Sequence, residues 1–255
     1  MDKPVLIIAG ASRGLGAAIA FQAAKLGVNL VIAARSLEDL EREAQRIRET
    51  GARVIAVRGD LTRMEDCERV VMQTIHHFGR LDALVNNMGM IEPISPLSKV
   101  SLEDWNANLA VNLLAPAMLT QASLPHLRQT TGRVINVSSG AAEKVFRGWG
   151  VYSVAKAGLN MLTRVLAEEE PTITTIAVKP GVVNTEMQAA VRSSGKAGMP
   201  EESHAFFVNL FERGKLLPPE VPGRVIAYLA LNAPHQWTGE CLLWNDEKVK
   251  AILPA

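Results

Sequence analysis

The sequence predicts an α/β protein built on a doubly wound parallel sheet. Short apolar runs recur along the 255 residues, and helical stretches separate them. Alternation of this kind favours parallel strands joined by crossover helices. No composition break or low-complexity tract interrupts the pattern, and 48% of the residues are hydrophobic, enough to bury one large core. We therefore expect a single domain over residues 1–255.

The expected strands are short and apolar, as strands buried in the middle of a parallel sheet usually are. They are Val5–Ala9, Val28–Ala34, Val54–Val57, Ala83–Asn86, Arg133–Val137 and Ile173–Val178, with a last strand around Leu242–Trp244. Ligands of such sheets bind beyond the carboxyl ends of the strands. Motifs that directly follow a strand are therefore the first candidates for a functional site.

The first expected strand runs into the glycine-rich segment GASRGLG at residues 10–16, and a helical pattern follows. Gly10, Gly14 and Gly16 lack Cβ atoms where a diphosphate would approach the backbone, and a helix N-terminus offers unpaired N–H groups to an anion. The spacing is GxxxGxG rather than the GxGxxG of the commoner dinucleotide fingerprint. Alternatively, the glycines form a turn that only packs the helix against the strand.

Tyr152 and Lys156 lie four residues apart in YSVAKAG, so they share one face of a helix. A neighbouring ammonium favours the phenolate and brings a phenol closer to proton exchange near neutrality. Ser139, thirteen residues before Tyr152, is placed to donate a hydrogen bond to the same substrate oxygen. The trio predicts proton transfer to a carbonyl. Taken alone, the Tyr–Lys pair also fits an ordinary solvated helix face.

Further segments complete a pattern that resembles the short-chain dehydrogenase/reductase family, in its shorter single-domain branch with a Rossmann-like sheet. The resemblance runs nearly end to end, and its additional motifs are Asp60 in GDLT, Asn86–Asn87 with Gly89, Asn112 in AVNLLAP, and Pro180, Gly181 and Thr185 in KPGVVNT. The resemblance implies that Tyr152 donates the proton, Ser139 orients the carbonyl and Asn112 supports a water-linked proton relay. It also implies that Lys156 lowers the tyrosine pKa and holds the ribose, and that a nicotinamide supplies hydride.

The same resemblance implies a set of cofactor-binding residues. They are Gly10, Ser12, Arg13, Gly14, Leu15, Gly16, Arg35, Asp60, Leu61, Asn87, Gly89, Tyr152, Lys156, Pro180, Gly181, Val183 and Thr185. The second expected strand ends in VIAARS, with Arg35 where NAD sites place a carboxylate for the ribose hydroxyls. Arg13 points to the same region in family members that use the phosphorylated cofactor, and a 2′-phosphate needs cations. We therefore expect NADPH; alternatively, both arginines are solvated surface residues.

The segments RGWGVYSVAKAGLNML, LAEEEP, PGVVNTEMQ and WNDEK resemble the sepiapterin reductase and benzil reductase subgroup. Its members reduce one carbonyl of a vicinal dicarbonyl or a carbonyl on a pterin side chain. Asp246 falls on the acidic residue that anchors the pterin; alternatively, it caps the terminal strand or pairs with Lys248.

The substrate pocket is expected to use Ser139 and Tyr152 together with Trp149, Met187 and Gln188, under a flap and small helical lid at residues 185–220. At most one of Phe206 and Phe207 can reach the site, because neighbours on a helix face different sides. Each of these apolar residues could instead belong to the core. Met88 replaces the usual alanine beside the cofactor, either reshaping the site or filling a gap in the core.

Other sequence features limit the partners to small molecules. The formal net charge is +1, with basic and acidic residues interspersed, so no nucleic-acid footprint is expected. No apolar stretch reaches membrane-spanning length and no signal-peptide pattern is present, which favours a cytoplasmic protein. Cys67 and Cys241 are read as reduced thiols, His76 and His77 as surface residues, and residues 38–49 as a solvated amphipathic helix. No metal site is expected.

The family resemblance also implies a homodimer or homotetramer, with the helices after Asn112 and around Tyr152 as the dimer face. Two other functions are weighed against a reductase. One is a catalytically silent NADP(H)-binding regulator on the same fold, although such a protein has no need of all four catalytic residues. The other is the longer epimerase/dehydratase branch, against which the glycine spacing and the chain length count.

Overall fold

One parallel sheet organises the protein. A computed structural model describes residues 3–254, so the extreme ends of the expected domain, residues 1–2 and 255, lie outside it. Within the described part, the strands form a seven-stranded sheet in the order β3-β2-β1-β4-β5-β6-β7. Every neighbouring pair is parallel. The expected doubly wound α/β fold is confirmed.

The strands lie close to where the sequence predicts them. They are β1 Val5–Ala9, β2 Asn29–Ala34, β3 Val54–Arg58, β4 Ala83–Asn86, β5 Arg133–Val137, β6 Thr174–Lys179 and β7 Cys241–Leu243. The bounds of β2, β3, β6 and β7 differ from the expected ones by a single residue. The reason is that pairing register, not apolarity, ends a strand: β3 includes the charged Arg58 because it pairs with Ala34 of β2.

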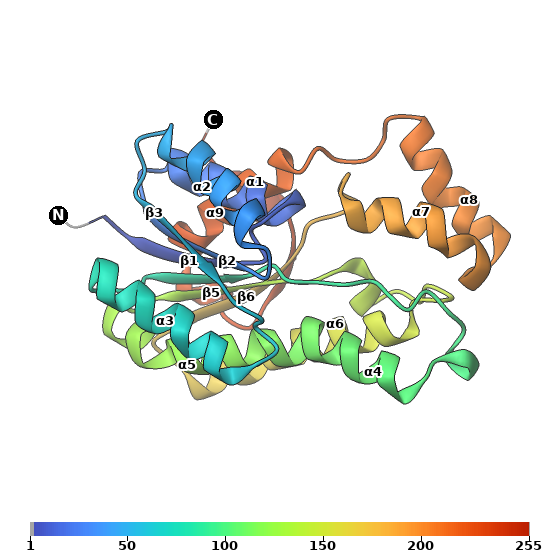
Figure 1. Cartoon of the computed structure of the whole chain (residues 1–255), viewed down its shortest axis with the longest axis horizontal. Helices are drawn as coiled ribbons and strands as arrows, with labels where there is room; N and C mark the ends of the chain where they lie inside the picture. The colour runs from blue at the N-terminus through green and yellow to red at the C-terminus, as the bar shows by residue number, and fades with distance from the viewer. Residues whose placement is uncertain (1–2, 255) are drawn as a thin grey trace.

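Helices cover both faces of the sheet (Figure 1). On one side lie α1 (Gly14–Lys25), α2 (Leu37–Arg48) and α9 (Glu220–Asn232), and on the other α3 (Met64–Phe78), α5 (Ala115–Thr130) and α6 (Gly150–Glu169). Successive residues of a strand point to opposite faces. Accordingly, Leu6 and Ile8 of β1 pack in one core cluster while Ile7 and Ala9 pack in another.

The remaining helices lie mostly at the carboxyl end of the sheet. They are α4 (Leu102–Leu109), a π-helical turn η2 (Ala110–Leu114), α7 (Glu186–Gly198), α8 (Glu201–Glu212), α10 (Glu247–Ile252) and the short 3₁₀ turns η1 (Leu97–Lys99), η3 (Gly140–Ala142) and η4 (His235–Trp237).

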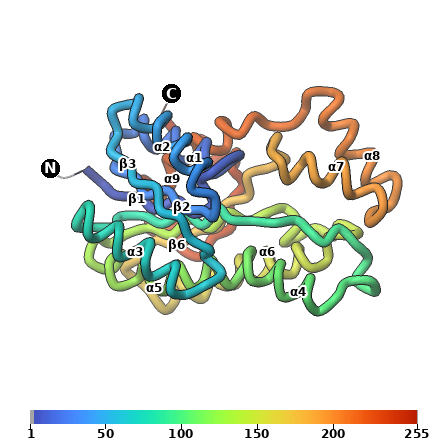
Figure 2. Tube along the Cα trace, viewed as in Figure 1, coloured from blue at the N-terminus to red at the C-terminus, as the bar shows by residue number. Residues whose placement is uncertain are grey.

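The segment with α7 and α8 is tied at its base. The backbone N–H of Asn184 donates to the Leu217 carbonyl (2.9 Å), and the Leu217 N–H donates to the Val182 carbonyl (2.9 Å). Between these anchors the chain leaves the sheet, and Figure 2 shows the two helices projecting from the main body. This excursion coincides with the stretch expected to form a flap and lid.

The structure also places several smaller features of the sequence. The charge run forms α2, an amphipathic helix that buries Leu40 and Ile47. His76 and His77 are exposed in the last turn of α3, and Cys67 and Cys241 are free thiols. Among the described residues, no group of His, Cys, Asp and Glu is arranged to hold a metal ion. Likewise, none of the helices in residues 3–254 is long and apolar enough to cross a membrane.

Candidate active site

The glycine-rich segment lies where the strand order reverses, between β1 and β4. The Asn87 side chain, just after β4, donates to the Gly10 carbonyl at the end of β1 (3.1 Å). Gly16 must be glycine, because a Cβ there would lie 2.0 Å from the Gly10 oxygen and 2.5 Å from Asn87 Nδ2. Gly10 and Gly14 adopt φ of +73° and +55°, a region that favours glycine.

The segment fits a diphosphate. Helix α1 begins at Gly14 and Arg13, its N-cap, gives it no side-chain capping bond, so its first N–H groups stay available to an anion. Ser12 and Leu15 are half-buried in the same turn. Thr185 approaches from beyond β6, its methyl group 3.3 Å from where a Gly14 Cβ would stand. Gly16 thus serves packing, as the alternative interpretation supposes, while the helix N-terminus keeps the chemistry of an anion site.

A pocket of about 470 Å³ opens at the ends of β2 and β3. Its lining is Arg35, Arg58, Gly59, Asp60, Asp66 and Arg69. Asp60 follows β3, and its carboxylate accepts from the Thr62 hydroxyl (2.7 Å) and the Thr62 N–H (3.1 Å). Leu61 is buried beneath it. The pocket brings together Arg35 and Asp60, two of the expected cofactor-binding residues, and adds Arg58.

The expected catalytic trio meets at the carboxyl end of β5. Ser139 follows that strand and accepts from the Ala141 N–H (3.1 Å), while Tyr152 and Lys156 lie one turn apart in α6. Both α6 side chains are buried, with exposed fractions of 6% and 3%. The Lys156 ammonium donates to the Val137 carbonyl (2.9 Å) and lies 5.8 Å from the centre of the Tyr152 ring.

Burial controls the protonation of this trio. It raises the pKa of Tyr152 to about 12, opposed by a hydrogen bond with Ser139. It also lowers the pKa of Lys156 to about 8. The lowering contribution to the tyrosine pKa thus comes from Ser139 and not, as the resemblance implies, from Lys156. At neutral pH Tyr152 is a protonated donor rather than a phenolate.

Asn112 lies in the π-helical turn η2, fully buried. Its amide donates to the carbonyls of Met90 (2.8 Å) and Asn108 (3.1 Å), and its Oδ1 accepts from the Met90 N–H (3.2 Å). A Cβ on Gly89 would stand 3.3 Å from that Oδ1. Asn112 therefore ties the segment after β4 to the helix that leads toward α5, and π turns of this kind often occur at functional sites.

An aromatic cluster packs against Tyr152. Trp149 stacks on Phe146 (ring centroids 4.9 Å apart) and on Phe207 of α8 (5.0 Å), whose rings are themselves 6.2 Å apart, and it meets Tyr152 edge-on (6.2 Å). Phe207 is 2% exposed, whereas its neighbour Phe206 is 53% exposed. Only one of the two phenylalanines faces inward, as expected for adjacent helical residues.

Two further expected pocket residues accompany the cluster. Met187 of α7 packs against the apolar side chains around Tyr152, and Gln188 is buried. Within residues 3–254, neither the Trp149 Nε1–H nor the Gln188 Oε1 has a hydrogen-bond partner, although both atoms are buried. Unpaired buried polar atoms are costly, which makes them candidates for contacts with a bound molecule.

The remaining expected residues follow β6 and β7. Pro180 and Gly181 directly follow β6, and a Cβ on Gly181 would meet Leu217 (2.8 Å) and the indole of Trp244 (3.1 Å). Val183 is paired with Leu217 at the base of the α7–α8 segment. Asp246 lies in the turn after β7, where its carboxylate accepts from the Leu243 N–H (2.8 Å). Lys248 pairs with Glu240 instead of Asp246.

Met88 lies at the border between the core and the glycine-rich segment. Its side chain packs with the core cluster beneath the sheet, and its Cγ lies 3.3 Å from the position of a Gly10 Cβ. It therefore fills the core and borders the glycine-rich segment at once.

The sequence motifs and the geometry agree with known proteins. A sequence profile described as short chain dehydrogenase matches residues 4–196. The chain belongs to the short-chain dehydrogenase family. A benzil reductase ((S)-benzoin forming) of Saccharomyces cerevisiae is 32% identical over 264 residues, covering 97% of this chain and 98% of that protein. A benzil reductase of Bacillus cereus is 34% identical over 232 residues, covering 88% and 92%.

The fold of this short-chain dehydrogenase also matches that of a solved structure. The crystal structure of a short-chain dehydrogenase/reductase from Saccharomyces cerevisiae has a TM-score of 0.94 at 32% identity, covering 98% of this chain and all of the other. Membership of the family supports an oxidoreductase that acts on CH–OH or C=O groups with a nicotinamide cofactor. The resemblance expected from the motifs is confirmed, and benzil reductases are among the relatives.

Two sets of residues in this short-chain dehydrogenase escaped the sequence reasoning. Arg58 enters the pocket at β2 and β3 only because of strand register, for which VRGD carries no local signal. Phe146 joins Trp149 and Phe207 through packing between α6, α8 and the segment before α6. In the sequence, only the short spacing between Phe146 and Trp149 indicates that their rings could come into contact.

Proposed function

We propose that the protein is an NADPH-dependent carbonyl reductase whose substrate is a ketone, most favourably an aromatic vicinal diketone. A carbonyl on a pterin side chain is the related possibility. The observation that carries this proposal is the placement of Tyr152, a protonated phenol held by burial and bonded to Ser139, against the aromatic cluster of Trp149 and Phe207.

The chain's own residues supply the proton and the orientation. Tyr152 gives its proton to the carbonyl oxygen, and Ser139 donates a second hydrogen bond to the same oxygen. The charge of Lys156 beside the phenol stabilises the tyrosinate that remains. Asn112, anchored through Met90 and Asn108, supports return of a proton through water. A bound nicotinamide supplies the hydride.

The preference for NADPH rests on charge. The residue that directly follows β2 is Arg35 rather than Asp or Glu, and both Arg35 and Arg13, at the start of α1, are exposed. Arginine forms bidentate hydrogen bonds with phosphate oxygens, so both residues suit a 2′-phosphate. The other proposed cofactor contacts follow β1, β3, β4 and β6, as inferred from the sequence motifs.

The choice of an aromatic substrate rests on the stacked rings and on the relatives. A planar aryl group beside Trp149 gains offset stacking in addition to buried area, and Met187 and Gln188 complete that wall. The segment 185–220 is the proposed flap and lid. Asp246 is held as a candidate for anchoring a pterin: its replacement by alanine then raises the Michaelis constant for sepiapterin and leaves that for benzil unchanged.

A homodimer or homotetramer accompanies this proposal. Val154, Met161 and Val165 of α6 are exposed apolar residues spaced to share one helix face, and Leu114 after Asn112 is exposed as well. Such a face suits symmetric association. The two free cysteines suit a reducing compartment such as the cytoplasm.

The decisive test follows NADPH and NADH oxidation with benzil, a methyl diketone, sepiapterin and an aryl aldehyde, using Tyr152→Phe as the control variant. Turnover of a diketone with NADPH, lost in Tyr152→Phe, supports the proposal. A preference for NADH contradicts the cofactor choice. Tight NADPH binding without turnover of any carbonyl favours the catalytically silent regulator instead.

A further inference from the structure

The pocket at the ends of β2 and β3 holds two arginines that stand side by side. Arg58 pairs in register with Ala34, and Arg35 is the next residue after Ala34. The Gly59 N–H also donates to the Ala34 carbonyl (2.9 Å), so the two strand ends stay in register past Arg58. Both side chains line the pocket of about 470 Å³.

Neither guanidinium is neutralised by the protein. Across residues 3–254, no salt bridge or side-chain hydrogen bond involves Arg35 or the Arg58 guanidinium, and both residues are exposed. Two like charges in one pocket repel each other unless an anion lies between them. Their placement therefore favours a ligand with at least two negative charges.

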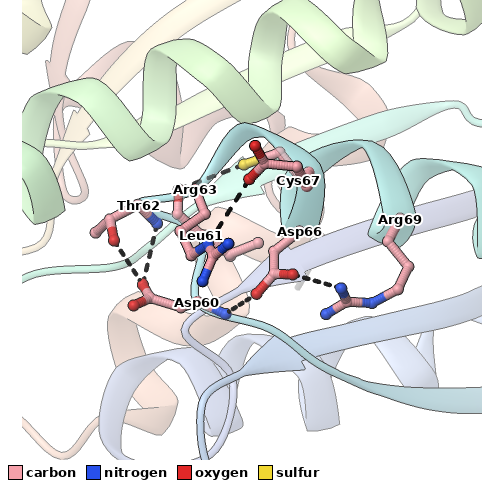
Figure 3. Close-up of polar contacts among 8 residues, drawn as sticks. Asp60, Leu61, Thr62, Arg63, Asp66, Cys67 and Arg69 are labelled. Carbon is pink, nitrogen blue, oxygen red and sulfur yellow. Dashed lines mark hydrogen bonds and ion pairs between the residues drawn. The ribbon is translucent and has the colours of Figure 1, made fainter.

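The acidic residues of the pocket are already engaged (Figure 3). Asp66 forms an ion pair with Arg69 and accepts from the Asp60 N–H (2.6 Å). These contacts lower the pKa of Asp66, with the Arg69 hydrogen bond as the largest cause. Asp60 in turn accepts from Thr62. The carboxylates of Asp60, in the loop after β3, and of Asp66, in the first turn of α3, thus have other partners and form no ion pair with Arg35 or Arg58.

The same network fixes the backbone that carries Arg58. The Arg69 guanidinium donates to the Arg58 carbonyl (2.8 Å) while it holds Asp66. Figure 3 shows Asp66 between Asp60 and Arg69. An anchored strand end presents its side chain with less loss of conformational freedom on binding, which strengthens each contact that the side chain makes.

We propose that Arg58 is a third residue of the 2′-phosphate site and determines the preference for NADPH together with Arg35. The phosphate lies between the two guanidinium groups, each of which donates to its oxygens. This inference rests on the proposed function, because it assumes that the cofactor enters the pocket at the ends of β2 and β3.

The test measures nucleotide binding without any carbonyl substrate. Titration calorimetry compares 2′,5′-ADP, which carries the 2′-phosphate, with 5′-AMP, which lacks it, on the full-length protein and on Arg58→Gln. A charged hydrogen bond to phosphate corresponds to a loss of about tenfold or more in affinity. We expect that loss for 2′,5′-ADP and a change within about twofold for 5′-AMP.

Two further variants sharpen the result. Arg53→Gln removes an exposed arginine next to the opposite end of the same strand, and should leave both affinities unchanged. Arg58→Lys keeps the charge without the bidentate geometry and should recover part of the affinity for 2′,5′-ADP. Raising the salt concentration should weaken 2′,5′-ADP binding less in Arg58→Gln than in the wild type.

The outcomes separate this inference from the proposed function. If the wild type prefers 2′,5′-ADP but Arg58→Gln leaves that preference intact, or weakens both nucleotides alike, Arg58 has no role with the 2′-phosphate and the proposed function stands. If the wild type binds both nucleotides equally, the NADPH preference fails and the role of Arg58 fails with it.

Discussion

The buried Lys156 ammonium should lower the free energy of unfolding of the protein. The variant Lys156→Met, which removes the charge, should show by how much. The ammonium is 3% exposed, its recorded hydrogen bond goes to the Val137 carbonyl, and burial lowers its pKa from 10.5 to about 8. A pKa difference of this size corresponds to about 3 kcal/mol of folding free energy.

The direction in which stability changes with pH follows from the number of protons bound by the folded and the unfolded chain. Between the folded pKa of about 8 and the unfolded value of 10.5, the unfolded chain holds more protons, so stability of the wild type rises with pH there. Below about pH 8 both states are protonated and the full cost is present. Methionine has no charge to bury, but it leaves the Val137 carbonyl without its donor, a loss of about 1 kcal/mol.

We therefore expect Lys156→Met to be about 2 kcal/mol more stable than the wild type near pH 7, and slightly less stable above about pH 10.5. Urea unfolding of both proteins at several pH values measures the difference in their free energies of unfolding. The contributions of all other titrating groups are the same in both proteins and cancel in that difference. Lys25→Met, which removes an exposed lysine, controls for the loss of one positive charge. A stability difference that does not vary between about pH 7 and 10.5 would refute the reasoning.

Four further predictions concern activity and binding. The kcat/KM of carbonyl reduction should fall as pH rises through about 8, because Lys156 of the enzyme without bound ligands loses its proton there; a pH profile of kcat/KM measures this. Gly16→Ala should lower the melting temperature and abolish cofactor binding, because its Cβ would overlap the Gly10 oxygen, whereas Gly140→Ala meets nothing within 4 Å and should change little. Asp66→Ala should raise KM for both cofactors, and more for NADPH than for NADH, because it frees the Asp60 loop and also releases the Arg69 that holds the Arg58 carbonyl; an equal rise for both contradicts this role. Phe207→Leu should lower kcat/KM for benzil relative to a methyl diketone by about fivefold to tenfold, since a lost aromatic pair is worth about 1 kcal/mol; equal losses for both diketones argue against stacking.

Local chemistry explains why much of this protein could be read from its sequence. The strands are continuous apolar runs because both faces of the sheet are covered, and Val5–Ala9 is fully buried in the structure. The Tyr152–Lys156 pair depends only on helical spacing, and the requirement for glycine at position 16 follows from the approach of Gly10 and Asn87. These features involve residues that are close in sequence or belong to a recurring motif, so their geometry is nearly independent of the rest of the chain.

Tertiary structure alone decided which distant residues share a site and how far their chemistry is perturbed. Arg58 joins Arg35 through the register of β2 and β3, which no local pattern encodes. Phe207 reaches Trp149 because α8 folds back over α6. The pKa of Tyr152 is raised by burial, a quantity that depends on all surrounding atoms, and it is lowered by Ser139 rather than by Lys156. Spacing along the chain specifies the groups that can react, whereas packing determines their solvation and hence their protonation and partners.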